Sequence, residues 1–326
     1  MSSDKYKTFL PSEHDVPTIH HLLLGGVAPR PIALVSTISK EGVNNLSPFS
    51  FFNAFGANPP TVAFSPSLRG RDGSSKDTLN NLREIPECVI SSVSYEMVEQ
   101  VSLASTEYDS DIDEFVKSGL TPLDSDLIKP KRVAQSPFQM ECKVNQIVEL
   151  GGGKASGNLV ICEVIKFHVR EDVIKNGVIE PNLINLVGRN SANYYTKAFD
   201  DAIIEIEKPI GKNGIGFDQL PDLIKKSHIF SANNLAQLAN CENLPTDSEV
   251  EQWVEEQNKI DISEPEIDLL FGGNNHNMMA AFAVTMLNQN HVRAKSFAEI
   301  AAKTALSNND PDTAWKLIRL LEQQNH

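Results

Sequence analysis

The chain has 326 residues, of which 40% are hydrophobic and 22% charged, a composition typical of a globular protein with one large domain or two smaller ones. Its net charge is −14, and because most of the excess falls on residues 198–326, binding to nucleic acid or to an anionic membrane is disfavoured. Since no apolar run reaches the roughly 20 residues that cross a bilayer, and the polar start Met1–Leu10 lacks a secretory pattern, we expect a cytoplasmic protein.

The first 197 residues contain short apolar, β-branched runs separated by turn residues. The pattern predicts strands over 31–39, 46–54, 61–65, 89–93, 139–150 and 158–170, and short helices over 78–84, 95–104 and 111–118. Because these strands follow one another without long helices between them, they favour an antiparallel barrel over a doubly wound parallel sheet.

Residues 198–326 differ in character and are predicted to form an acidic, mostly helical extension of unknown role, separate from residues 1–197. Ser248 is the expected cap of a helix over 248–259, with Glu251 completing a capping box. Trp315, Ile318 and Leu321 recur on one face of a helix predicted over 312–323. Further helices are expected over 278–287 and 296–306.

Several kinds of catalytic motif are absent from the sequence. It contains no G-x-x-x-x-G-K-[ST] phosphate loop, no G-x-G-x-x-G fingerprint and no G-x-S-x-G elbow. The four cysteines form no C-x-x-C pair, and the adjacent His20 and His21 point apart, so no metal site is expected. The acidic run Glu107–Glu114 is predicted to be a solvated face.

One loop, Ser65–Thr78, is rich in hydroxyl groups and cations and leads directly into a predicted helix. The hydroxyls of Ser74, Ser75 and Thr78, the Lys76 ammonium and the free amides of a helix N-terminus together suit a phosphomonoester dianion. The alternative is that Asp77 merely caps a surface helix while the basic residues keep the loop solvated. The loop by itself does not decide between these two interpretations.

The order and spacing of several motifs over about residues 20–197 resemble the flavin reductase-like family, whose fold is the FMN-binding split barrel. The motifs are Arg30-Pro31-Ile32-Ala33-Leu34-Val35-Ser36-Thr37, Gly42, Asn45 to Asn53, Asn58-Pro59-Pro60, Lys76-Asp77-Thr78-Leu79 with Asn81, Glu114-Phe115, Gly119-Leu120, Ser136-Pro137, Glu141-Cys142, Gly188-Arg189 and Tyr194-Tyr195.

This resemblance implies a mainly β, α+β fold: a six-stranded antiparallel Greek-key split barrel with short helices, usually a homodimer, with FMN near each subunit interface. It assigns the isoalloxazine ring to Ser47, Pro48, Phe49 and Ser50, bordered by Ser36 and Thr37. It assigns the ribityl chain and phosphate to Asn53, Lys76, Asp77 and Thr78, with Arg71 as a second cation and Arg189 reaching the flavin or the partner subunit.

The implied activity is hydride transfer from NADH or NADPH to FMN, with the reduced flavin feeding a monooxygenase. Such a transfer requires stacking and orientation and no protein base, so no catalytic acid, base or nucleophile is expected. Two alternatives stay open: an FMN-holding electron carrier that does not oxidise nicotinamide directly, and an interaction protein that has lost its flavin. The helical extension could cover the flavin cleft, enlarge the dimer interface or dock a partner.

Overall fold

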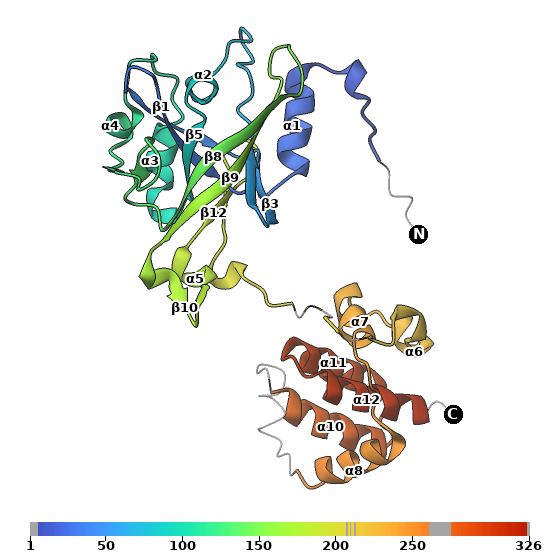
Figure 1. Ribbon diagram of the computed structural model, residues 1–326. Helices are drawn as coiled ribbons and strands as arrows, with labels where there is room; N and C mark the ends of the chain where they lie inside the picture. Colours follow the sequence, from blue (N-terminus) through green and yellow to red (C-terminus); the bar gives the residue numbers. More distant parts are fainter. Residues whose placement is uncertain (1–5, 207, 209, 212, 261–274, 325–326) are drawn as a thin grey trace. The chain divides into compact units, whose positions relative to one another are not determined.

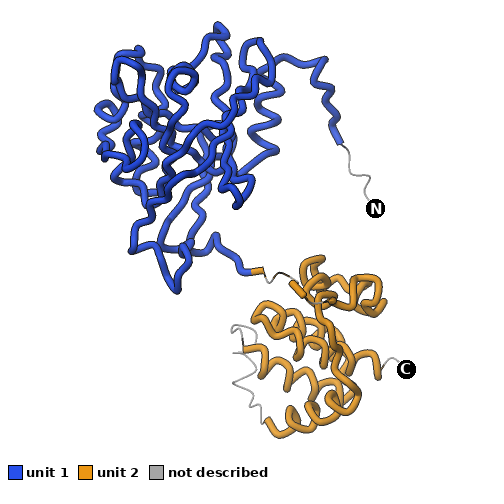
Figure 2. Tube along the Cα trace, in the orientation of Figure 1, with its two compact units in different colours: residues 1–205 blue, residues 206–326 orange. Residues whose placement is uncertain are grey.

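The computed structural model describes residues 6–324 apart from 207, 209, 212 and 261–274. The chain divides into two compact units, residues 1–205 and 206–326 (Figures 1 and 2). Each unit has a hydrophobic core of its own, so each is held together by its own buried apolar surface.

Unit 1 is built on an antiparallel sheet of seven strands, in the order β2-β1-β5-β8-β9-β4-β3. The long strands β8 and β9 pair along almost their whole length and form its middle (Figure 1). The strands are β1 (Ala33–Ile38), β2 (Asn44–Phe49), β3 (Phe52–Ala57), β4 (Pro60–Phe64), β5 (Glu87–Ser91), β8 (Phe138–Glu149) and β9 (Asn158–Val169).

The prediction of six strands in a barrel is wrong by one strand, because the run predicted over 46–54 is interrupted. It ends as β2 at Phe49 and resumes as β3 at Phe52, and these two strands form opposite edges of the sheet. Pro48 lies in β2, where the missing N–H is tolerated because β2 is an edge strand. Within the described residues β2 and β3 do not pair, so the barrel is not closed. The two edge strands of the sheet are joined only through the chain itself, at Ser50-Phe51.

Smaller elements surround this sheet, and all three of the predicted short helices are present, with shifted ends. The helix α1 was not predicted; Asp15 caps it by accepting a 3.0 Å hydrogen bond from the Thr18 amide. The helices are α1 (Val16–Gly26), α2 (Asp77–Glu84), α3 (Val98–Leu103), α4 (Glu114–Ser118) and α5 (Pro181–Ile184). The short strand pairs are β6 (Pro122–Leu123) with β7 (Arg132–Val133), β10 (Ile174–Lys175) with β11 (Val178–Ile179), and β12 (Val187–Arg189) with β13 (Tyr195–Lys197).

Strand β1 separates the two apolar clusters of unit 1. Successive side chains of a strand point to opposite faces, so Ala33 and Val35 pack in one cluster while Ile32 and Leu34 pack in the other. Both faces of β1 are therefore covered, which explains the nearly continuous apolar run in its sequence.

Unit 2 is helical, and its core contains the apolar face predicted for its last helix: Trp315, Ile318 and Leu321 are all buried. The cap predicted at Ser248 is wrong, because Thr246 caps the helix and forms the capping box with Glu249. The helices are α6 (Asp222–Lys225), α7 (Ala232–Ala239), α8 (Asp247–Gln257), α10 (His276–Asn288), α11 (Ala294–Ser307) and α12 (Pro311–Gln324).

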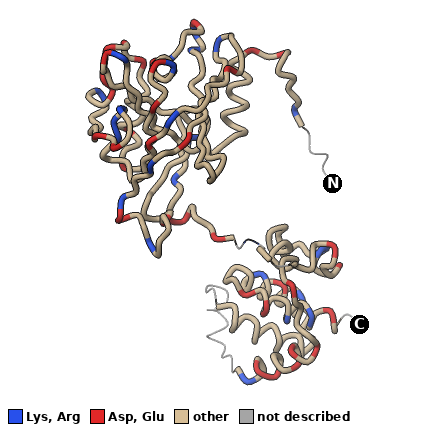
Figure 3. The backbone as a smooth tube through the Cα atoms, viewed as in Figure 1, with Lys and Arg blue, Asp and Glu red and all other residues tan. Residues whose placement is uncertain are grey.

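Along the described trace of each unit, Lys and Arg lie among Asp and Glu (Figure 3). Of the helices that the structure describes, none combines the length and apolar character needed to span a membrane.

Candidate functional site

The N-terminus of α2 carries a cluster of unused hydrogen-bond donors. Lys76 is its N-cap residue and provides no side-chain cap, and the amides of Asp77 and Thr78 have no acceptor among the described residues. The Lys76 ammonium lies 5.4 Å from the centre of the Phe49 ring and forms no ion pair with a described carboxylate. Burial lowers the pKa of Lys76; Glu107 opposes this shift and Arg69 adds to it. The helix start therefore presents an uncompensated, partly buried cation.

The other cations of the loop have protein partners. Arg71 is exposed, with its guanidinium 3.0 Å from Glu107 and 3.1 Å from Asp72. Arg69 is largely buried and bonds the Ser75 carbonyl, with the Asp77 carboxylate at 3.5 Å. The predicted second phosphate cation, Arg71, is thus already neutralised by carboxylates, whereas Lys76 is not.

The predicted residues Thr37 and Thr78 belong to a buried polar network. Both hydroxyls donate to the Asn45 side-chain oxygen, at 3.1 Å and 2.8 Å, and Asn81 donates to Thr37 at 3.1 Å. The Thr78 hydroxyl therefore donates its proton within the protein. The donor of Thr78 that stays available at the helix N-terminus is its backbone amide. The network fixes α2 against β1 and β2.

Glu114 completes this network and corrects the sequence interpretation of its surroundings. Its carboxylate accepts bonds from the Asn45 side chain at 3.1 Å and from the Leu46 amide at 3.0 Å, and the residue is buried. Burial raises the pKa of Glu114, and these hydrogen bonds only partly offset it. Glu114, at the end of the run Glu107–Glu114, therefore bonds to the edge strand β2 and does not lie on a solvated face.

Ser36 and Thr37 are both fully buried and, as neighbours in β1, project to opposite faces of the sheet. The Ser36 hydroxyl has no hydrogen-bond partner among the described residues. The structure does not bring these two hydroxyls to one side, and a contact of either with a ring stays a prediction.

The stretch Ser47–Ser50 lies at the end of edge strand β2, beside the Lys76 cation. Phe49 points into the core and packs against Phe64, with ring centres 5.4 Å apart, while Ser47, Pro48 and Ser50 are partly exposed. Asn53 is exposed on β3, and its side chain accepts a bond from the Ala54 amide. The stretch thus offers an accessible strand edge backed by an aromatic core.

Arg189 lies at the Ser50 end of this edge and not at the loop Ser65–Thr78. It exchanges two backbone hydrogen bonds with Arg30, and its guanidinium lies 4.5 Å from the Tyr195 ring centre. Arg30 is buried and donates to the Ser50 hydroxyl at 3.2 Å and to the Val27 carbonyl at the end of α1. Burial and the neighbouring Arg189 lower the pKa of Arg30. No sequence signal beyond the Arg30-Pro31 motif predicted this role for Arg30.

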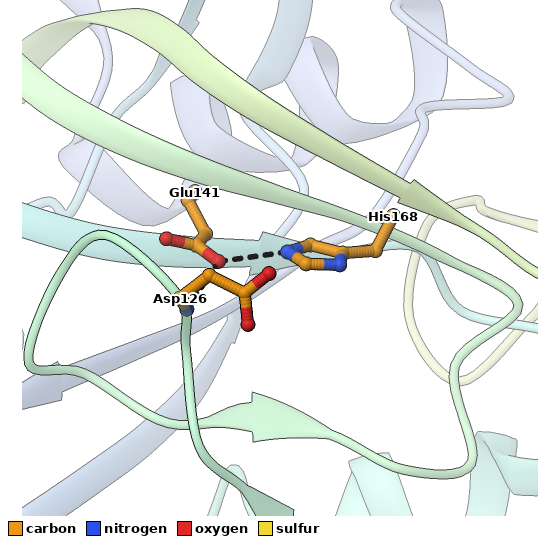
Figure 4. A group of neighbouring side chains, drawn as sticks. All are labelled: Asp126, Glu141 and His168. Atoms are coloured by element: carbon orange, nitrogen blue, oxygen red, sulfur yellow. Dashed lines mark hydrogen bonds and ion pairs between the residues drawn. The ribbon is translucent and has the colours of Figure 1, made fainter.

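Asp126, Glu141 and His168 form a further group that the sequence analysis did not identify as a cluster (Figure 4). The fully buried Glu141 accepts from His168 at 2.7 Å and from the amides of Asp126 and Leu127, both at 2.8 Å, while Asp126 pairs with Lys166. Burial would raise the pKa of Glu141, but these hydrogen bonds outweigh it and lower the pKa. Because its oxygens are occupied by protein donors, Glu141 anchors the 124–127 loop to β8 and β9.

Known proteins match a part of this chain. A model of the flavin reductase like domain matches residues 25–199. An uncharacterised protein of Aquifex aeolicus is 33% identical over 199 residues, which are 61% of this chain and 99% of that protein. One of Halalkalibacterium halodurans is 37% identical over 180 residues, 55% of this chain and 86% of that protein.

Solved structures also resemble part of this chain. Nitrilotriacetate monooxygenase component B from Bacillus cereus is 29% identical, with a TM-score of 0.59 over 63% of this chain and all of that one. The 2-nitrobenzoate 2-nitroreductase of Pseudomonas fluorescens is 26% identical, with a TM-score of 0.55 over 62% of this chain and 96% of that one. A split barrel protein of Shewanella frigidimarina shares the fold, with 23% identity and a TM-score of 0.52 over 60% of this chain and 96% of that one. Since the family model spans more than half of the residues, this chain belongs to the flavin reductase-like family.

Proposed function

We propose that this protein binds FMN on unit 1 and reduces it with NADH or NADPH. The observation that carries the proposal is the Lys76 ammonium, which is partly buried beside the uncapped start of α2 and has no ion-pair partner among the carboxylates that the structure describes. A phosphate dianion there would accept from that ammonium and from the amides of Asp77 and Thr78. The phosphate charge would also raise the pKa of Lys76, which burial lowers.

The ring would lie along the partly exposed edge at Ser47–Ser50, where the ring of the buried Phe49 lies 5.4 Å from the Lys76 ammonium. Phosphate and ring would then bind at adjacent parts of one surface. Arg30 holds the Ser50 hydroxyl in place at the other end of this edge. Asn53, on the next strand, is accessible to the ribityl chain.

Bound FMN would supply the chemistry, by accepting a hydride from the nicotinamide. The chain's task is to orient the two rings and to exclude other reactions, so the proposed mechanism assigns no acid, base or nucleophile to the protein. The similarity to a monooxygenase component B supports an oxygenase as the user of the reduced flavin.

The alternative is an FMN-binding electron carrier that receives electrons from a protein and not from nicotinamide. The experiment that separates the two is anaerobic mixing of the FMN-loaded protein with NADH or NADPH, followed by flavin absorbance. Bleaching faster than that of free FMN supports the reductase. A yellow protein that neither nicotinamide bleaches supports the carrier.

The phosphate site itself is tested by titrating the protein with FMN. Lys76→Ala is expected to weaken FMN binding by about ten- to a hundred-fold, as the loss of a charge-assisted hydrogen bond would. The matched control is Arg71→Ala, which removes a cation from the same loop that already has carboxylate partners, and it should change the affinity much less. Equal losses in both variants, or none in Lys76→Ala, would exclude Lys76 as the specific phosphate contact.

We also propose that unit 1 forms a homodimer. Helix α1 has an apolar sequence but no buried residue, and Leu22 and Leu23 are exposed. The edge strand β3 is exposed, including Phe55, so its free backbone groups are available for pairing. Light scattering on the purified chain should give twice the chain mass, and Phe55→Asp should lower it; a monomeric parent chain contradicts this proposal.

A further inference from the structure

Unit 2 contains a cavity of about 560 Å³ that lies outside the family match. Its lining combines charged, hydroxyl and apolar side chains: Asp222, Leu223, Lys226, Ser227, His228, Ile229, Lys295, Ser296 and Glu299. These residues come from α6, the segment that follows it and the start of α11. The volume is sufficient for a small organic molecule.

The most unusual group in this lining is the carboxylate of Glu299. The residue is 4% exposed, and one of its oxygens accepts a 3.1 Å bond from the Ser227 hydroxyl. The other oxygen, Oε1, is buried and has no hydrogen-bond partner among the described residues. A buried carboxylate oxygen without a donor is costly, so this atom favours a ligand that brings an N–H, most of all an ammonium.

One turn earlier, the same helix offers the opposite charge. The N-cap of α11, Arg293, provides no side-chain cap, and the amides of Lys295 and Ser296 have no acceptor in the described part of the chain. The Lys295 ammonium forms no ion pair with a described carboxylate, whereas Lys226 on the same lining is paired with Asp222 at 2.8 Å. The helix start is thus suited to a carboxylate.

The spacing between the Glu299 carboxylate and the start of α11 limits the kind of ligand that can reach both. Lys295 and Glu299 are four residues apart on one helix face, which separates their Cβ atoms by only about 5–6 Å. A ligand that satisfies both must carry its ammonium and its carboxylate close together, as on a single carbon atom. Leu223 and Ile229 on the same lining add an apolar surface for a side chain.

We propose that this cavity binds a free α-amino acid with an aliphatic side chain. Its ammonium donates to Glu299 Oε1, and its carboxylate accepts from the first-turn amides of α11 and from Lys295. The inference concerns unit 2 alone and does not depend on flavin binding by unit 1.

The test is calorimetric titration of the full chain with L-leucine. The proposal expects saturable binding of one leucine per chain and no binding of leucine methyl ester or N-acetyl-leucine, each of which lacks one charged group. Glu299→Gln should weaken leucine binding by about ten- to a hundred-fold, because an amide is a poorer acceptor for an ammonium. FMN titration of the same variant should be unchanged.

Two further measurements keep the test decisive. Circular dichroism and tryptophan fluorescence report whether Glu299→Gln is folded. If it is not, Lys295→Met at an exposed position is used instead, and it should weaken leucine binding at least several-fold. The proposal is overturned if no leucine binds, if a folded Glu299→Gln binds it as well as the parent chain, or if the ester or the acetylated compound binds equally well.

Discussion

The buried carboxylates of the two units differ in how they are bonded. In unit 1 the buried carboxylates of Glu114 and Glu141 accept hydrogen bonds at both oxygens, from backbone amides and from side chains. In unit 2 the buried Glu299 has one bonded oxygen and one without a partner in the described structure. A carboxylate bonded at both oxygens holds a fold together, whereas the unpartnered oxygen of Glu299 needs another explanation, which the proposed ligand would provide.

The strongest test of this comparison is whether the units are independent. Trp315→Ala should lower the unfolding free energy of unit 2 by about 3–5 kcal/mol, because Trp315 is fully buried in its core. Unit 1 should be unaffected, since its clusters contain no residue of unit 2.

The sequence provides a separate probe for each unit: both tryptophans lie in unit 2 and all five tyrosines in unit 1. Denaturant unfolding followed by tryptophan fluorescence should therefore shift in Trp315→Ala, while the near-ultraviolet dichroism of the tyrosines should not. The matched control is Phe115→Ala, in the core of unit 1, which should shift only the tyrosine signal. A joint shift in either variant would show that the units unfold together.

The next largest effect is expected at Glu141. Glu141→Ala should lower the stability of unit 1 by about 2–3 kcal/mol, because it leaves the amides of Asp126 and Leu127 and the His168 ring without the acceptor that they share. Asp172→Ala breaks the exposed Arg170–Asp172 pair instead and should cost at most about 1 kcal/mol. Equal losses in both variants would contradict the anchoring role.

Glu141 also predicts a dependence on pH. Its pKa is lowered in the folded protein, so its contribution is present above the ordinary pKa of Glu and is lost as the pH falls through the folded value. Unfolding of unit 1 at decreasing pH should show this loss in the parent chain and less of it in Glu141→Gln.

The smallest effect is expected at Glu114. Glu114→Gln should cost about 1 kcal/mol, because the amide keeps one acceptor oxygen where the carboxylate has two. The pKa of Glu114 is raised, so its contribution to stability falls as the pH rises from the ordinary to the folded value, opposite to that of Glu141. The variant should therefore remove a decline in stability over mildly acidic pH; an unchanged pH profile would contradict the assignment.

Strand positions and the start of α2 were predictable because alternation and turn residues are local signals. The break at Ser50-Phe51 was not, because β2 and β3 read as one apolar run and their placement at opposite sheet edges depends on distant partners. Glu114 was misinterpreted for the same reason: a carboxylate within an acidic run looks solvated unless the strand that it bonds is known.

The order of strands in unit 1 has a consequence for how the chain acquires its fold during synthesis. Two of its strand pairs join residues that are far apart in the sequence. Strand β1 pairs with β5, as in Ser36 with Val89, and β4 pairs with β9, as in Thr61 with Glu163. β4 can pair with its neighbour β3 at once, but a nascent chain leaves its other edge unpaired until about a hundred further residues have left the ribosome, and a topology with such distant pairings folds slowly. Ribosome-bound chains that end before β9 should consequently remain sensitive to protease.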